Sequence, residues 1–492
     1  MNITDIIEQQ AECLGDQPCV FMENETWSYR DLDRHVWRIS KLLHHTGVRP
    51  GDVVAHTFTS EAALLVTLLA TARIGATVLG ITPGTPSLLR NQMLKQTSTR
   101  WLATDQTSLS DSDLRNIVVS LDSQAADAGL PDRAIQDDAP LAPWILASGS
   151  GSTGKPKLMP IKHEHQWTRM KAGLSWLPYT AKDILVSLIP LDFYAPKLRY
   201  LEAFTKGASI ALVDRRKFSI SNAAHGRPVT VVYGTVSHAE QTLKALPGTL
   251  QQPCWESLSA FMVGGSTVSS DLRERICTRL CSKLYILYGA NECSTTCCAS
   301  PKDLHSYPGL VGTTHEGFEL QIVDGQGQAL KTDQVGLVRI KSQTTIDGYL
   351  NDDAATKKVF RDGWFYPGDL GKLTPDGHLI HMGRTDDMMI ANGVNIYPAE
   401  IEQALGTHPD ILDVVAIPLK HQVHQDIPIC AVELSSSSEV SEKELISYGI
   451  ERLGAHAPVR ILSVKKIPRN EQGKLIRTEL NRMITDVLRL RR

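Results

Sequence analysis

A loop rich in glycine and hydroxyl residues is the first segment whose composition indicates chemistry. The apolar run Ile145–Ala147 is followed by Ser-Gly-Ser-Gly-Ser-Thr-Gly-Lys-Pro-Lys, which ends at Lys157. Backbone N–H groups and hydroxyls in such a loop can surround a phosphate group, and the two lysines can neutralise its charge. The segment therefore predicts a strand followed by a loop that binds a polyphosphate.

Two familiar nucleotide-binding patterns also match this loop. Gly149, Gly151 and Gly154 satisfy G-x-G-x-x-G, and the stretch from Gly149 to Lys155 satisfies G-x-x-x-x-G-K. Pro156 disfavours both interpretations. A dinucleotide-binding fold needs a helix to continue at this point, and the Walker pattern needs Ser or Thr next to hold magnesium. From this segment alone, a flexible surface linker remains an alternative.

Four further blocks follow at wide intervals along the chain. They are YGANE (Tyr288–Glu292), GWFYPGD (Gly363–Asp369), a stretch from Gly383 to Glu402, and NEQGKLIR (Asn470–Arg477). Together with the loop, and in this order over nearly the whole chain, they resemble the acyl-adenylate-forming superfamily. That superfamily includes acyl- and aryl-CoA ligases, the adenylation domains of peptide synthetases and beetle luciferase. The ANGVNIYPAEIE part of the third block is most similar to the free-standing CoA ligases.

The resemblance implies a complete nucleotide site with ATP and Mg²⁺ as cofactors. Glu292 would bind Mg²⁺, a hard cation that prefers oxygen ligands. Tyr288 would stack on adenine, Asp369 would accept hydrogen bonds from the ribose, and Arg384 would contact ribose or phosphate. Lys474 would be the catalytic cation between the acyl carboxylate and the α-phosphate. The other nucleotide-binding residues that it implies are Ser150, Gly151, Ser152, Thr153, Gly154, Lys157, Gly265, Ser266, Gly289 and Asn291.

The acyl pocket is the part of the site for which the resemblance is least informative. In amino-acid-activating relatives, an aspartate near Asp192 pairs with the substrate amine, whereas the local sequence favours a simple helix N-cap. Aromatic neighbours would suit an aryl or a small or medium acyl group. The residues expected to line the pocket are Asp192, Phe193, Tyr194, Tyr233, Gly234, Gly264 and Cys297, with Cys298 as a further candidate.

A smaller C-terminal domain is expected to rotate between two half-reactions. The resemblance places the hinge at Asp386 and the entry tunnel for a thiol beside Gly393, where the lack of a side chain lets a pantetheine arm pass. No carrier domain follows Lys474, so the thiol is expected to come from CoA or from the phosphopantetheine of a separate carrier protein.

The implied activity is ATP-dependent conversion of a carboxylic acid to acyl-AMP with release of pyrophosphate, followed by transfer of the acyl group to that thiol. An alternative is a stand-alone amino-acid adenylating enzyme that loads a carrier protein. A luciferase-like oxygenase is a further alternative.

Several positions depart from the family pattern. Leu158 follows the loop where glycine is usual, Asn291 replaces the threonine before Glu292, and Pro367 stands where threonine is common. The region Leu191–Tyr194 lacks the frequent histidine. None of these changes removes an implied catalytic group.

Repeated β-α-β units must position these residues. Val53–Thr57 and Ala76–Gly80 are predicted strands around the helix Glu61–Arg73, and Asp271–Cys281 is a predicted helix before the strand Lys283–Leu287. Such repeats predict layered α/β sheets, mainly parallel, that bind ligands beyond the carboxyl ends of the strands. Residues 1–385 are expected to form a large N-terminal domain, and residues 386–492 a smaller, mobile α+β domain that carries Lys474. In this second domain Pro398–Leu405 is a predicted helix.

The overall composition is that of an ordinary soluble protein. The chain has 492 residues, of which 42% are hydrophobic and 21% charged, with a formal net charge of −3. This balance gives no reason to expect nucleic-acid binding. The apolar stretch from Ala62 to Ala72 is too short to span a bilayer, so no membrane insertion is expected. The nine cysteines are irregularly spaced, which favours reduced thiols and a cytoplasmic location.

Overall fold

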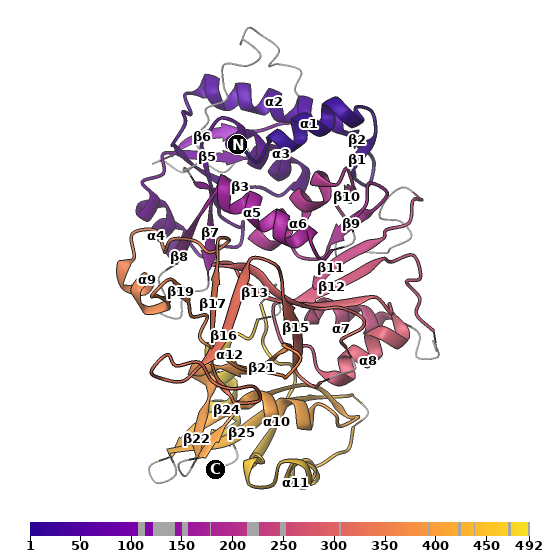
Figure 1. The fold of residues 1–492 in the computed structure, drawn as a ribbon, viewed down its shortest axis with the longest axis vertical. Helices are drawn as coiled ribbons and strands as arrows, with labels where there is room; N and C mark the ends of the chain where they lie inside the picture. The colour runs from indigo at the N-terminus through magenta and orange to yellow at the C-terminus, as the bar shows by residue number, and fades with distance from the viewer. Residues whose placement is uncertain are drawn as a thin grey trace.

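The computed structural model describes residues 1–106, 114–121, 143–149, 156–177, 179–213, 226–246, 252–304, 307–391, 394–421, 425–436, 438–470 and 474–490. The predicted loop residues 150–154 and Gly393 lie outside these ranges. The chain runs from an N-terminal part, indigo to magenta, through a central part to a C-terminal part in orange and yellow (Figure 1). In the described residues the strands form three sheets.

The first sheet has six strands and leads into the glycine-rich loop. Its strands are β3 (Val53–Thr57), β4 (Thr77–Gly80), β5 (Trp101–Thr104), β6 (Arg115–Val118), β7 (Pro143–Gly149) and β8 (Lys157–Lys162). They are ordered β6-β5-β3-β4-β7-β8, and all pairs are parallel except β7 with β8. The strand after the loop is therefore antiparallel, and no helix continues from Pro156 as the dinucleotide-binding pattern would require.

The second sheet is longer and changes character part of the way across. Its strands are β1 (Pro18–Phe21), β2 (Thr26–Ser28), β9 (Ile184–Ser187), β10 (Ser209–Ala211), β11 (Val231–Thr235), β12 (Ala260–Gly264), β13 (Leu284–Ala290), β14 (Ser294–Ala299), β15 (Leu310–Thr314), β16 (Phe318–Val323), β17 (Gly336–Ser342), β18 (Phe360–Arg361), β19 (Trp364–Phe365), β20 (Asp369–Leu373) and β21 (Leu379–Arg384). The run β1-β10-β9-β11-β12-β13 is parallel.

From β14 onward the pairs of this sheet are antiparallel. In this sheet the prediction of mainly parallel pairing is therefore correct only for the run that ends at β13. The physical reason is the short connection between β13 and β14. Three residues cannot hold the crossover helix that a parallel pair needs.

Helices cover both faces of the parallel half of this sheet. The helices of the N-terminal part are α1 (Asp5–Leu14), α2 (Tyr29–Thr46), α3 (Glu61–Arg73), α4 (Ser87–Thr97), α5 (His163–Leu174), α6 (Tyr194–Thr205), α7 (Val236–Ala245), α8 (Ser270–Arg279) and α9 (Asp353–Val359). Tyr233 and Met262 pack in one hydrophobic cluster with α6, whereas Val232 and Phe261 pack in another with α7 and α8. Neighbouring residues of each strand thus face opposite layers, as strand geometry requires.

The third sheet is built from strands that follow the predicted domain boundary. The helices and strands of this C-terminal part are η1 (Thr385–Asp387), β22 (Met389–Ala391), β23 (Val394–Ile396), α10 (Pro398–Leu405), β24 (Ile411–His421), β25 (Gln425–Leu434), α11 (Glu442–Leu453), η2 (Gly454–His456), β26 (Arg460–Val464) and α12 (Arg477–Leu490). The strand order is β23-β22-β25-β24, with β26 parallel to β25. The boundary that we predicted after residue 385 falls within η1.

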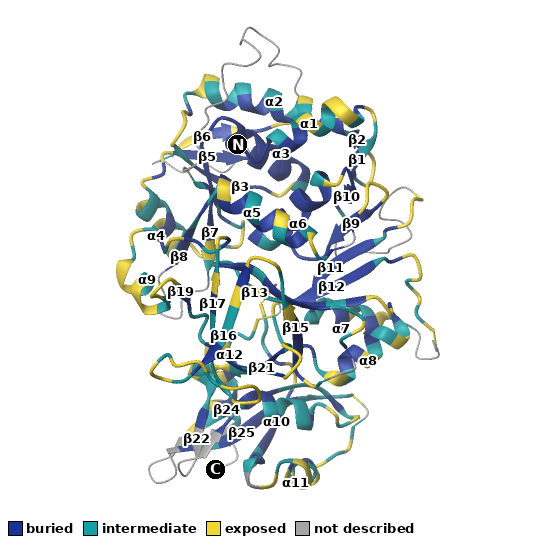
Figure 2. Ribbon diagram, in the orientation of Figure 1, coloured by how far each residue is buried: buried dark blue, intermediate teal, exposed yellow. Residues whose placement is uncertain are grey.

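The predicted fold class is confirmed, with a large α/β part and a smaller C-terminal part. Buried residues fill the strands and the inner faces of the helices, and exposed residues lie mainly on loops and helix surfaces (Figure 2). Helix α3 and strand β3 have the predicted bounds. None of the helices in the described part of the chain has the length and apolar composition needed to cross a bilayer.

Candidate active site

The two ends of the glycine-rich loop are held side by side. Gly149 at the end of β7 is paired with Lys157 at the start of β8. Leu158, the residue that departs from the family pattern, is fully buried beside Leu79 and Leu146. This side chain therefore packs the start of β8 into the core beneath the loop. The loop therefore starts and ends at the carboxyl edge of a mainly parallel sheet, where ligands commonly bind.

The turn between β13 and β14 carries the predicted metal glutamate. At Gly289 the two strands approach so closely that a Cβ atom would lie 2.1 Å from the Ser294 carbonyl oxygen. Only glycine fits such an approach. The close contact ends β13 and turns the chain directly after Ala290, which places Asn291 and Glu292 in the turn.

Glu292 is held through both its main chain and its side chain. Its carbonyl oxygen accepts hydrogen bonds from Arg169 Nη2 at 3.0 Å and from the N–H of Ile346 at 2.9 Å. The hydroxyl of Tyr349 donates to Glu292 Oε1 at 2.7 Å. Lys157 Nζ lies 5.1 Å from the centre of the Tyr349 ring. The predicted metal ligand and a predicted phosphate-binding lysine are thus joined by one tyrosine.

Asp369 forms a second centre with two other predicted nucleotide residues. The Tyr288 hydroxyl donates to Asp369 Oδ2 at 2.6 Å, and Arg384 Nη1 donates to Oδ1 at 2.7 Å. Asp369 begins β20 and is paired with Arg384 at the end of β21. Pro367, another departure from the family pattern, uses its carbonyl oxygen to accept from the same Arg384 atom.

The electrostatics of Asp369 favour its ionised form. Burial alone would raise the pKa of this carboxyl group. The nearby His381, at 3.7 Å, together with Arg384 and the Tyr288 hydroxyl, outweighs burial and lowers the pKa of Asp369 well below its usual range. An ionised carboxylate at this position is a strong acceptor for ribose hydroxyls.

The end of β12 contributes a third predicted nucleotide segment. Gly264 is buried, and Gly265 has a φ of +88°, a conformation that favours glycine. The buried Oγ of Ser266 has no hydrogen-bond partner among the described residues. A buried unpaired hydroxyl is unfavourable, so a polar ligand group fits this position.

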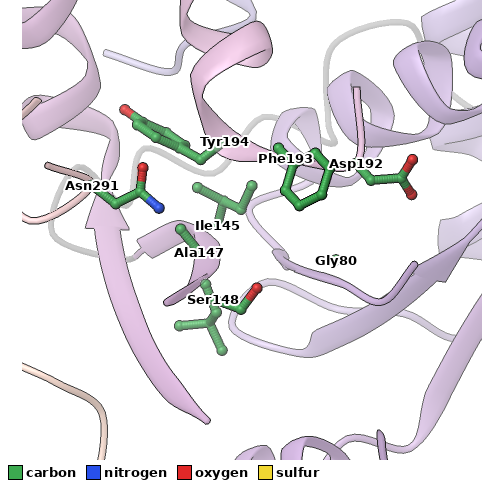
Figure 3. A pocket seen from close by; sticks show the side chains of 9 residues that line it. Gly80, Ile145, Ala147, Ser148, Asp192, Phe193, Tyr194 and Asn291 are labelled. Atoms are coloured by element: carbon green, nitrogen blue, oxygen red, sulfur yellow. The ribbon is translucent and has the colours of Figure 1, made fainter. Parts of the chain in front are cut away.

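A small pocket adjoins the strand that enters the glycine-rich loop (Figure 3). It brings together four residues that we predicted: Asp192, Phe193, Tyr194 and Asn291. In Figure 3 the Asp192 carboxylate points away from Tyr194 and Asn291. The pocket is completed by Gly80, Ile145, Leu146, Ala147 and Ser148.

The N-cap interpretation of Asp192 is wrong. Helix α6 begins at Tyr194 and its N-cap residue is Phe193, so Asp192 lies one position too early. The carbonyl oxygens of the preceding loop are instead held by Lys197, whose Nζ donates to Leu191 and Asp192 at 2.5 and 2.6 Å. Burial, partly offset by the charge of Asp192, lowers the pKa of Lys197 to about 7.

The other predicted pocket residues separate into two groups. Tyr233 and Gly234 lie in β11, and Tyr233 packs in the same cluster as Tyr194 and Cys298. Cys297 packs in a different cluster with Val311 and Phe318. Because neighbouring strand residues face opposite sides, Cys298 rather than Cys297 shares the layer of the aromatic pocket residues.

Lys474 and the hinge lie in the C-terminal part of the chain. Lys474 is exposed, and its main chain exchanges hydrogen bonds with Asn470. Three residues later, Arg477 forms an ion pair with Asp387 in η1, next to the predicted hinge residue Asp386. The lysine is therefore linked through α12 to the turn in which the domain boundary was predicted.

The sequence did not identify the residues that support these groups. Tyr349 and Arg169 contact Glu292, and Lys197 organises the loop before α6. Each lies far along the chain from its partner or inside a helix, with no spacing pattern that would mark it. Arg169 and Lys197 are charged residues among the buried residues of α5 and α6, and this was the signal that the sequence offered for them.

Comparisons with known proteins place the chain in a family. The model described as "AMP-binding enzyme" matches residues 7–350, and "AMP-binding enzyme C-terminal domain" matches residues 400–474. A 2-succinylbenzoate–CoA ligase of Bacillus cereus is 25% identical, over 97% of this chain and 98% of its own length.

Solved structures share the fold. MatB of Rhodopseudomonas palustris with bound ATP has a TM-score of 0.88 at 20% identity, covering 99% of this chain and 100% of its own. The o-succinylbenzoate CoA synthetase of Bacillus subtilis, bound to its acyl-adenylate intermediate, has a TM-score of 0.84 at 23% identity, covering 96% and 97%. The predicted resemblance is confirmed, and the chain belongs to the AMP-binding enzyme family.

Proposed function

We propose that this protein is an acid–thiol ligase that activates a carboxylic acid with ATP and transfers the acyl group to CoA. The observation that carries the proposal is the pair of preformed centres, Glu292 with Lys157 and Asp369 with Tyr288, in a chain of the AMP-binding enzyme family. The activities in the names of the 2-succinylbenzoate–CoA ligases agree with it.

The residues divide the work of adenylation. Asp369 would hold the ribose, and Tyr288 would lie beside the adenine. Lys157 and the glycine-rich loop would bind the phosphates, and Glu292 would hold Mg²⁺. The bound metal would neutralise charge on the triphosphate. Lys474 would approach the acyl carboxylate and the α-phosphate, where a mobile cation stabilises the charge that develops during attack.

The aromatic residues near α6 favour an aryl or a medium acyl substrate. Tyr194 and Tyr233 are buried in one cluster, and Phe193 packs against it. An anthranilate CoA ligase with bound anthranoyl-AMP shares the fold, with a TM-score of 0.85 at 21% identity, covering 98% of this chain and 97% of its own. The amino-acid alternative depends on Asp192, whose carboxylate is directed away from Tyr194 in Figure 3 and lies near the Lys197 cation. We therefore favour an acid without an α-amine, and CoA over a carrier protein.

The direct test is carboxylate-dependent exchange of pyrophosphate into ATP. A panel of aryl acids, small and medium acyl acids and amino acids would be offered, with CoA and a pantetheinylated carrier protein as competing acceptors. We expect exchange with an aryl or acyl acid and thioester formation on CoA. Exchange with no member of the panel would contradict adenylation, and preference for free amino acids would favour the alternative.

A variant of Lys474 distinguishes the two half-reactions. In Lys474→Ala, exchange of pyrophosphate should fall by about 100-fold or more, because the variant lacks the cation that stabilises the developing charge. Thioester formation from a supplied acyl-adenylate should change far less. Lys465→Ala, at an exposed position in the same domain, is the control. Equal losses in both steps would refute the assigned role.

A further inference from the structure

Tyr349 lies between the carboxylate and the lysine that would face the phosphates. Its hydroxyl donates to Glu292 Oε1 at 2.7 Å, and its ring centre lies 5.1 Å from Lys157 Nζ. The side chain is buried, with 7% of its surface exposed. One side chain therefore contacts both a predicted metal ligand and a predicted phosphate ligand, although neither sequence block contains it.

The main chain around Tyr349 is fixed to both arms of the site. On one side, the N–H of Ile346 donates to the Glu292 carbonyl oxygen at 2.9 Å. On the other, the N–H of Leu350 donates to the Leu158 carbonyl oxygen at 2.8 Å. The N–H of Tyr349 itself donates to Thr356 Oγ1 at 2.9 Å. These bonds fix the position of the ring relative to β8 and to the β13–β14 turn.

The contacts of Tyr349 leave room for a ligand on each partner. A carboxylate has two oxygens with two lone pairs each, and the Tyr349 hydroxyl uses one lone pair on Oε1 of Glu292, so the carboxylate can still bind a cation. The ring uses its electron-rich face to hold the Lys157 ammonium by a cation–π contact.

We propose that Tyr349 is a positioning residue that presets the Glu292 carboxylate for Mg²⁺ and the Lys157 ammonium for the phosphates of ATP. The inference rests on the proposed function, because it assigns Mg²⁺ to Glu292 and phosphate to Lys157. It goes further by linking the two through one side chain. The hydroxyl sets the affinity for the metal, and the ring sets the affinity for the phosphates.

The two parts of the side chain can be tested separately. Tyr349→Phe removes the hydroxyl and keeps the ring. The test measures ATP binding by calorimetry across a titration of Mg²⁺, with no carboxylic acid substrate present. The concentration of Mg²⁺ at half-maximal ATP binding should rise about tenfold, because the variant lacks a hydrogen bond to a charged group. ATP affinity at saturating Mg²⁺ should stay within about threefold, since the ring is still present.

A second variant and a control test the ring. Tyr349→Leu should weaken ATP binding even at saturating Mg²⁺, because the contact with Lys157 is lost. Tyr448→Phe is the matched control, since the hydroxyl of Tyr448 is also hydrogen-bonded, to Thr407, but lies in the C-terminal part. It should leave the Mg²⁺ titration unchanged. If Tyr349→Leu binds ATP as Tyr349→Phe does, the role of the ring is refuted.

A double variant distinguishes direct coupling from a general loss of structure. In a Glu292→Gln background, Tyr349→Phe should no longer shift the Mg²⁺ titration, since the carboxylate that it orients is absent. A shift of the same size in both backgrounds, or no shift in the single variant, would overturn the inference. Failure of the wild-type protein to bind ATP with Mg²⁺ would instead count against the proposed function.

Discussion

At the scale of single residues, the site is built from charged groups whose partners are already in place. Tyr288 and Arg384 each use a different oxygen of Asp369, and both contacts are shorter than 2.8 Å. Each carboxylate oxygen can accept more than one hydrogen bond, so ribose hydroxyls can be added without removing these partners. Such preorganisation reduces the cost of ordering the site when the nucleotide binds.

Asp369→Asn tests this arrangement through the ribose. We expect the KM for ATP to rise about tenfold or more, because a neutral amide replaces an ionised acceptor. The wild-type protein should prefer ATP over 2′-deoxy-ATP, and the variant should lose most of this preference. Asp324→Asn is the control, because Asp324 is a half-buried residue before a surface turn and its Oδ1 accepts hydrogen bonds from the N–H groups of Gln326 and Gln328. A variant that still discriminates between the two nucleotides as the wild type does would contradict the role of Asp369 at the ribose.

The sequence predicted the groups that would touch ligands better than the groups that support them. Glu292, Tyr288 and Asp369 stand in blocks with a recognisable order. Tyr349 and Arg169 do not, because their contacts with Glu292 depend on how segments 57 and 123 positions away fold back. The sequence also did not predict which side of the strand each side chain faces. Cys297 and Cys298 were both candidates for the pocket, and only Cys298 packs with its aromatic residues.

At the scale of elements, both nucleotide motifs lie where a parallel sheet meets an antiparallel strand. The glycine-rich loop joins β7 to the antiparallel β8, and YGANE joins β13 to the antiparallel β14. The sequence predicted α3 and β3 correctly because their apolar periods are unambiguous. It missed the change to antiparallel pairing after β13, since the period of a strand does not reveal the direction of its neighbour.

Helix α5 is joined to the N-terminal segment by a histidine that must stay neutral. The N–H of Ile3 donates to His163 Nδ1 at 3.1 Å, which requires a free lone pair on that nitrogen. Burial, with a contribution from the N-terminal amine, lowers the pKa of His163 to about 4. Because the unfolded chain takes up this proton more readily, the contribution of His163 to stability is lost as the pH falls from about 6.5 to about 4.

His163→Asn should therefore change the pH dependence of stability. An amide oxygen can accept from Ile3 and does not titrate. As the pH is lowered from 7 to 4, the free energy of unfolding of the variant should rise by on the order of 2–3 kcal/mol relative to that of the wild type. Denaturant unfolding at several pH values measures this gain, and His45→Asn, at an exposed position on α2, is the control. A constant difference between variant and wild type at all pH values would refute the assignment.

At the scale of the whole molecule, a short turn, a few polar contacts and a small apolar cluster attach the C-terminal part to the site. In this cluster Met388 and Tyr397 pack against Leu370, Ile380 and Met382. Arg384 ends β21 and donates a hydrogen bond to Asp369, and η1 follows it directly. Within η1, Asp387 forms an ion pair with Arg477 of α12. Lys244 of α7 also lies 3.7 Å from Glu433 of β25. Arg477 and Lys244 are about half exposed, so these two ion pairs contribute little to the free energy that holds the C-terminal part in this orientation.

Asp386→Pro tests whether this turn is a hinge. Proline fixes φ near −65°, so it removes the backbone freedom that rotation requires while remaining compatible with the first turn of a short helix. If the hinge lies here, adenylate formation needs a single orientation of the C-terminal part, whereas transfer to the thiol needs rotation after the adenylate has formed. In single-turnover measurements the transfer rate should therefore fall by about tenfold or more relative to pyrophosphate exchange. Asp386→Ala removes the same exposed side chain but leaves φ free, so it should keep the wild-type ratio of the two rates. If the alanine and proline variants give the same ratio, the hinge does not lie at Asp386.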